Sequence, residues 1–216
     1  MRASFLLLTL LYSIALMLLS NVQAATKEGW ELSLGLGASY SLDQDITLQL
    51  KDQPDITLNG NRESKPFSSP LYYGARVSYW WDDQAIELEG IHHKVYVDDA
   101  LPTQVEKFEV TDGYNLFYTN YAVNWRGSLI LRAGIGGVIA HPDVIIEGDR
   151  TFGGYQFAGL SGQVGVEKEF SLTKHWLLSL EGKVSISEAD ININQGSADV
   201  PDTAFHLLGH LKYHFD

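Results

Sequence analysis

The sequence predicts an all-β chain in which eight antiparallel strands close into an up-and-down transmembrane β-barrel. Eight segments alternate apolar and polar residues with period 2, which places one set on each face of a strand. The connections alternate between short turns and long segments, and aromatic residues gather at the segment ends. Short turns on one side, longer loops on the other and aromatic girdles are typical of barrels that cross a membrane.

The C-terminal segment, from Asp202 to Asp216, alternates most clearly. One face carries Thr203, Phe205, Leu207, Gly209, Leu211, Tyr213 and Phe215, and the other carries Ala204, His206, Leu208, His210, Lys212 and His214. A helix would scatter both sets, so the pattern predicts a strand with one apolar and one basic, polar face. The seven other predicted strands cover residues 29–41, 71–81, 85–96, 108–122, 129–140, 155–170 and 175–187.

Two of these segments are irregular. Residues 91–95 lose the alternation, which predicts a β-bulge or an exit from the membrane. In segment 108–122 we expect the outward, apolar set to be Val110, Tyr114, Leu116 and Tyr118, opposite Glu109, Thr111, Gly113, Asn115 and Thr119.

The connections set the orientation. Short turns are expected at 82–84, 124–127 and 171–174, and long loops at about 42–69, 97–107, 141–154 and 188–202. Both chain ends and the short turns would then face the periplasm. In the first loop the repeat of Asp-Ile-Thr-Leu at 45–48 and 55–58 predicts a hairpin above the membrane. The other loops carry the acidic residues Asp98, Asp99, Glu106, Asp143, Glu147, Asp149, Asp190, Asp199 and Asp202, so we expect the negative charge to lie mostly outside the barrel.

The N-terminal 24 residues predict an export signal. Arg2 precedes an apolar run over residues 5–19, and Val22-Gln23-Ala24 resembles a small-residue cleavage site. Cleavage near Ala24 would leave a single barrel domain, residues 25–216. The alternative is an N-terminal membrane anchor, but the apolar run is shorter than the roughly 20 residues that a spanning helix needs.

Composition excludes several function classes. The chain has no cysteine, so disulfides and thiolate metal sites are excluded. Its net charge of −12 argues against nucleic-acid binding, which needs a basic surface. We expect no cofactor and no metal: adjacent His92 and His93 would point to opposite faces of a strand, and Lys212 between His210 and His214 would repel a cation.

The aromatic residues predict two membrane interfaces. The expected periplasmic rim comprises Trp30, Tyr79, Trp81, Trp125, Phe170, Trp176, Tyr213 and Phe215, and the opposite rim Tyr40, Tyr73 and Tyr155. The alternative is a soluble barrel of lipocalin type with its apolar face inward. The export signal and the aromatic rims together favour the membrane barrel.

The polar face predicts a charged lumen. We expect a network of Glu31, Arg76, Glu87, Glu89, Arg132, Glu167, Glu181, Lys183, His210 and Lys212, with His93, Glu109, Glu169 and His214 as further lumen residues. Eight strands enclose a space that side chains just fill, and buried charges persist only when they are paired. The sequence therefore predicts a salt-bridged plug rather than an open pore.

Catalysis is a weaker hypothesis. A lipid-modifying barrel would need a nucleophile, a histidine and a carboxylate at the outer rim. The candidates are His92 or His93, Glu109, Asp112 and His141, with His93 expected opposite Glu109 if the second loop closes a hairpin near Ala100.

The eight alternating segments, the loop asymmetry and the Tyr213-x-Phe215 ending resemble the small outer-membrane barrel superfamily typified by OmpA, OmpX and OmpW. The resemblance covers the mature chain, although Asp216 follows the phenylalanine. It implies a monomer of the Gram-negative outer membrane, with outer-membrane lipids, lipopolysaccharide and the barrel assembly machinery as partners. The expected role is structural or interactive through acidic loops; the alternatives are a lipid-A-modifying enzyme and a narrow channel for small solutes.

Overall fold

The computed structural model describes residues 26–51, 53–63, 71–97 and 100–215. The predicted export signal lies outside these residues. The fourteen strands are β1 (Gly29–Ser41), β2 (Ile46–Leu50), β3 (Ile56–Leu58), β4 (Arg62–Glu63), β5 (Tyr73–Trp81), β6 (Gln84–Val97), β7 (Val105–Trp125), β8 (Leu129–Ala140), β9 (Asp143–Ile146), β10 (Asp149–Phe152), β11 (Gln156–Ser171), β12 (Trp176–Ile193), β13 (Gly196–Asp199) and β14 (Asp202–His214).

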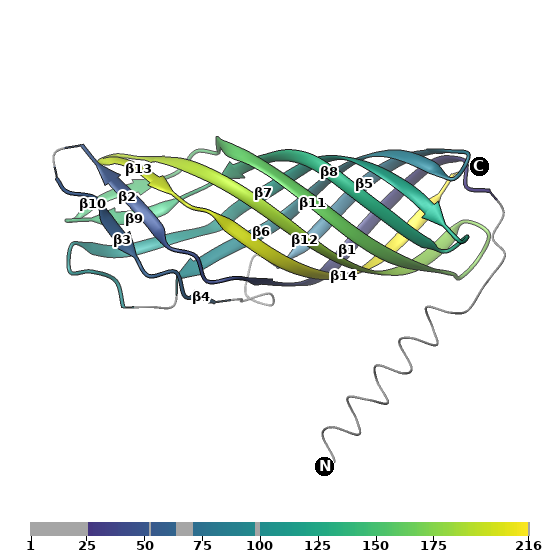
Figure 1. The fold of residues 1–216 in the computed structure, drawn as a ribbon, viewed down its shortest axis with the longest axis horizontal. Coiled ribbons are helices and arrows are strands. Elements are labelled where there is room, and N and C mark those ends of the chain that lie inside the picture. Colours follow the sequence, from purple (N-terminus) through teal and green to yellow (C-terminus); the bar gives the residue numbers. More distant parts are fainter. Residues whose placement is uncertain (1–25, 52, 64–70, 98–99, 216) are drawn as a thin grey trace, which may run out of the picture.

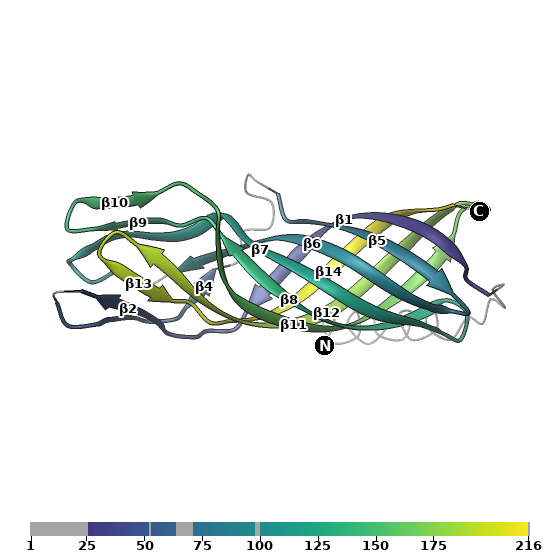
Figure 2. The same ribbon diagram turned by 90° about the horizontal axis from the view of Figure 1, so that it is seen from above.

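Eight long strands close into a barrel. The antiparallel pairs run β1–β5, β5–β6, β6–β7, β7–β8, β8–β11, β11–β12 and β12–β14. The circle is completed because β14 also pairs with β1, with Leu211 opposite Leu34. Figures 1 and 2 show the strands tilted around one long axis. The predicted up-and-down barrel of eight strands is therefore confirmed.

The start of β1, the end of β14 and the tight turns meet at one end of the barrel. Asp82 and Asp83 form the β5–β6 turn with φ angles of 45° and 64°, a left-handed conformation that aspartate tolerates. The Asp83 amide donates to the Lys27 carbonyl, and the Phe215 amide donates to the Trp30 carbonyl. The C-terminus lies at this end in Figure 1, and the shorter strands β2, β3, β9, β10 and β13 lie at the other.

The barrel wall is apolar outside. Ile135 is 78% exposed, Leu34 59% and Leu207 57%, although all three sit in regular strands. Trp30, Tyr79, Trp81, Trp125 and Trp176 are exposed near the end that carries the tight turns. A continuous belt of large exposed apolar side chains around a folded chain marks a surface that contacts something other than water.

Strand β7 departs from the expected orientation. Val110, Tyr114, Leu116 and Tyr118 are buried inside, whereas Phe117 and Tyr121 face outward. The expected outward set was wrong because the tyrosine rings fill the lumen while their hydroxyls bond to Ser187 and Ser161. Apolar character alone could not identify the outer face of this strand.

The long connections, expected to be loops, are largely strands. The predicted hairpin is present as β2 and β3, with Ile46 opposite Leu58. The ends of β6, β7 and β12 continue beyond the barrel, and β9–β10 and β13 pair with β7 and β12. We call this part the β-extension. Its interior is packed by buried apolar side chains: Ile46, Leu48, Leu50, Leu58, Val105, Phe108, Val144, Ile146, Ile191 and Ile193.

An ion pair fastens the β9–β10 hairpin. Arg150 donates two hydrogen bonds of 2.8 and 2.9 Å to Asp143, and Lys107 on β7 contacts the same carboxylate. The Arg150 hydrogen bonds are the main reason that the pKa of Asp143 is lowered to about 2. The ionised carboxylate therefore stabilises the hairpin, and this contribution is lost as the pH falls from about 4 towards 2.

We expect Asp143→Asn to weaken the hairpin by about 1 kcal/mol at neutral pH, a modest effect because Arg150 is half exposed. The measurement is hydrogen–deuterium exchange of the β9–β10 amides in both proteins. The ratio of variant to wild-type exchange should exceed one at pH 7 and be clearly smaller, though still above one, at pH 2.5. An equal ratio at both pH values would contradict the assigned role of the carboxylate.

Within the described residues, no helix has the length and apolar character needed to cross a membrane.

Candidate functional site

The lumen of the barrel is filled by charged side chains from the inward faces of seven strands. Because successive side chains of a strand point to opposite faces, each of these inward residues has an apolar neighbour in the same strand that faces outward. The structure puts all ten predicted network residues inside and at most 4% exposed: Glu31, Arg76, Glu87, Glu89, Arg132, Glu167, Glu181, Lys183, His210 and Lys212.

Two arginines form the centre of this network. Arg76 lies 2.6 Å from Glu167, 3.2 Å from Glu181 and 3.3 Å from Glu89. Arg132 lies 2.8 Å from both Glu87 and Glu167, and it also contacts Glu181. The guanidinium fork offers several donors in a fixed plane, so each arginine can bridge carboxylates from different strands.

Lysines complete the network towards both ends. Lys183 pairs with Glu89 at 2.5 Å, and Lys212 lies 2.8 Å from Glu31. Lys27, which precedes β1, closes the turn end by pairing with Glu31 at 2.7 Å and by lying 4.4 Å from the Trp80 ring centre. Sequence reasoning missed Lys27 because it lies outside the alternating segment; its i,i+4 spacing to Glu31 was the available signal.

A second layer lies between the charged network and the β-extension. Tyr72 and Ser185 bond to the two ring nitrogens of His206, each at 2.7 Å. His93 lies 3.0 Å from Asp202 and 3.2 Å from Ser39. Sequence reasoning assigned Asp202 to an acidic loop, which was wrong: Asp202 is fully buried because β14 begins there with that side chain inward.

The catalytic candidates do not form one site. Glu109 pairs in register with Tyr96, and His93 pairs with Tyr114, so the expected His93–Glu109 contact is wrong. A register shift lies between His93 and Val95, at the predicted bulge, and Glu109 instead contacts Lys107 of the same strand, 3.1 Å away. His93 is buried in the lumen and His141 lies on the outside of the barrel. The Asp112 side chain lies outside the described part of the structure.

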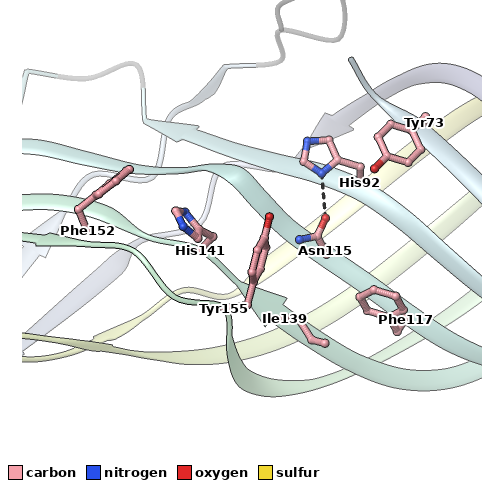
Figure 3. Close-up of a pocket in the computed structure, with 8 residues that line it drawn as sticks. All are labelled: Tyr73, His92, Asn115, Phe117, Ile139, His141, Phe152 and Tyr155. Carbon is pink, nitrogen blue, oxygen red and sulfur yellow. Dashed lines mark hydrogen bonds between the residues drawn. The ribbon is translucent and has the colours of Figure 1, made fainter. Parts of the chain in front are cut away.

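A pocket opens on the outer wall where the barrel meets the β-extension. It has a volume of about 860 Å³ and is lined by Tyr73, His92, Asn115, Phe117, Ile139, His141, Phe152 and Tyr155. Figure 3 shows these side chains around the pocket and the 2.8 Å hydrogen bond between His92 Nδ1 and Asn115 Oδ1. Neither His92 nor His141 meets a carboxylate among the residues that line it. The arrangement can bind through imidazole and aromatic rings but lacks a nucleophile–histidine–carboxylate set.

The described residues contain no group of three or more histidine, aspartate or glutamate side chains placed to hold a metal ion. His92 and His93 do point to opposite faces, one into the lateral pocket and one into the lumen.

Neither a family model nor a curated protein sequence matches the chain. Several solved structures of small outer-membrane β-barrels are similar to it. The attachment invasion locus protein Ail of Yersinia pestis is 11% identical, covers 88% of this chain and 100% of its own, and gives a TM-score of 0.45. Neisserial surface protein A is 12% identical over 87% and 98%, with a TM-score of 0.39. The outer membrane protein AlkL is 14% identical over 90% and 94%, with a TM-score of 0.49.

Similarity at this level carries no functional inference, and the barrel fold rests on the strand pairing of the chain itself.

Proposed function

We propose that the protein is a monomeric, integral barrel of the Gram-negative outer membrane whose lumen is closed, with a structural or interactive role. The observation that carries the proposal is the inversion of polarity. The outer wall exposes leucine, isoleucine and aromatic side chains, while arginine and glutamate fill the centre. Water-soluble barrels place their apolar face inward, whereas a lipid-facing barrel reverses this arrangement.

The charged network supports a closed lumen. Each charged residue of the network lies within 4 Å of an opposite charge, and the two arginines join carboxylates from β6, β11 and β12. Above it, the buried apolar interior of the β-extension forms a second seal. Both layers argue against the alternative of a narrow channel.

The β-extension would be the contact surface on the cell exterior. Glu106, Glu147, Asp149, Asp190 and Asp199 are exposed there, which favours partners with basic surfaces. Outer-membrane lipids and lipopolysaccharide would surround the barrel. Export through a signal peptide cleaved near Ala24, followed by insertion by the barrel assembly machinery, would complete its biogenesis.

A planar-bilayer recording of the refolded mature chain tests the closed lumen. We expect no stable conductance steps, because ions would have to displace paired charges in a water-poor space. Heat-modifiable gel mobility of the same sample must establish that the barrel has formed, and a porin of known conductance serves as the positive control. Stable openings by the folded protein would favour the channel instead.

A further inference from the structure

Two hollows on the outer wall adjoin each other across β6, β7 and β8. The upper one is the lateral pocket described above. The lower one has a volume of about 430 Å³ and is lined by Leu88, Glu89, Gly90, Phe117, Tyr118, Thr119, Ile135 and Gly136. Phe117 lines both, so the two hollows are neighbours along the wall, from the edge of the β-extension down its apolar surface.

The upper hollow is aromatic and polar. The His92 ring stacks on Tyr73 with centres 5.3 Å apart, and His141 lies 5.0 Å from Tyr155 and 5.5 Å from Phe152. The Arg150 guanidinium lies 4.5 Å from the Phe152 ring centre. The lining residues include no carboxylate, in a chain whose net charge is −12.

His92 supplies a specific acceptor. Its Nδ1 bonds to the carbonyl oxygen of Asn115, so Nδ1 carries the proton and Nε2 carries the lone pair in the neutral ring. The ring is 7% exposed, and Nε2 has no hydrogen-bond partner among the described residues. A hydroxyl group of a ligand would satisfy this acceptor if the His92 ring tilted towards the hollow on binding. A sugar ring offers hydroxyl donors, and this hollow offers an acceptor beside flat aromatic rings.

The lower hollow is an apolar trough with a floor of glycine. A Cβ added at Gly90 would lie 3.3 Å from the Phe117 ring. The trough therefore depends on the absence of a side chain at Gly90, which faces outward in β6. Leu88 and Ile135, 64% and 78% exposed, form its walls and would contact a hydrocarbon chain.

We infer that this depression binds one acylated saccharide lipid of the surrounding leaflet, with its sugar in the upper hollow and an acyl chain in the trough. The inference rests on the proposed insertion of the barrel in the outer membrane. Beyond membrane insertion, we assign a defined lipid site to the outer wall. In this site His92 accepts a hydroxyl hydrogen bond, and Gly90 keeps the trough open. The polar end and the apolar end of one amphiphile match the order of the two hollows along the wall.

The test uses the full mature chain, labelled with 15N-histidine, in phosphatidylcholine nanodiscs. Lipid A, an acylated disaccharide, is added at rising mole fraction, and phosphatidylglycerol is the comparison lipid because it has acyl chains and a phosphate but no sugar. Lipid A should shift the side-chain nitrogens of His92 and His141 and leave those of lumenal His206 and His210 unchanged. Equal shifts with phosphatidylglycerol, or no shift with either lipid, would overturn the saccharide site.

Two variants test the contribution of each hollow to lipid binding. His92→Leu should weaken lipid A binding about tenfold through loss of one hydrogen bond. Gly90→Leu should weaken it similarly by filling the trough, since its side chain faces outward beside the movable Phe117 ring. The matched control is Gly209→Leu, which fills an apolar groove on the opposite wall beside Leu36 and Leu180 and should leave binding unchanged. Equal loss in all three variants would overturn the site.

Heat-modifiable mobility of every sample is recorded first. A chain that fails to form a membrane-inserted barrel contradicts the proposed function, whereas an inserted barrel without the His92 response contradicts only the lipid site.

Discussion

Replacing Glu181 with leucine should lower the free energy of unfolding by about 3–5 kcal/mol, because it leaves several buried cations with too little compensating charge. The Glu181 carboxylate is fully buried and lies 3.2 Å from both Arg76 and Lys183 and 2.8 Å from His210; it also contacts Arg132. Water cannot replace it in a lumen that side chains already fill.

The measurement is urea unfolding of the refolded barrel in phospholipid vesicles, followed by tryptophan fluorescence. Glu188→Leu is the matched control, since Glu188 lies in the same strand but faces outward and is exposed. It should change stability by under about 0.5 kcal/mol. A loss as small as this for Glu181→Leu would mean that the lumen is hydrated and that its charges are not a plug.

A double variant distinguishes unpaired charge from lost packing. In Glu181→Leu/Lys183→Met, one anion and one cation are removed together, and Glu89 keeps Arg76 as a partner at 3.3 Å. Replacing a buried ion pair with apolar groups of similar volume is often close to neutral. The double variant should therefore be more stable than Glu181→Leu alone, and a further loss would favour lost packing as the cause.

The fold could be predicted in large part from the sequence because a barrel wall depends on local alternation. In β1 and β14 almost every second residue is apolar and outward, so the two faces and the approximate ends of these strands follow directly. The β-extension could not be recognised in this way. Its inward residues Ile191 and Ile193 alternate with Asp190 and Asn192, but the acidic and amide side chains gave the segment the composition of a loop.

The candidate sites were less predictable because they depend on register between strands. The types of residue in the lumen follow from alternation in single strands, whereas the partners of Arg132 come from β6, β11 and β12 and depend on strand stagger. The broken alternation around His93 indicated a bulge, but it did not reveal the register in which His93 pairs with Tyr114 and Glu109 with Tyr96. The lateral pocket joins His92 to His141 across β6, β7 and β8, a contact that no sequence spacing reveals.

Replacing Ile135 with lysine should separate the membrane barrel from a soluble one. Ile135 is 78% exposed and lies near the middle of β8, between the rim at Trp125 and the β-extension. At the centre of a lipid-facing wall, lysine should cost about 2–4 kcal/mol. On a water-facing wall the same change would remove an exposed apolar side chain and leave stability within about 0.5 kcal/mol.

Leu172→Lys supplies the depth control for this measurement. Leu172 is 55% exposed in the β11–β12 turn, at the end of the barrel that carries the tight turns. Near a membrane interface lysine should cost no more than about 1 kcal/mol. Unfolding in vesicles should therefore rank the variants by depth, with Ile135→Lys far below Leu172→Lys. Equal, small effects at both positions would contradict the membrane-spanning wall, and with it the lateral lipid site that depends on the wall.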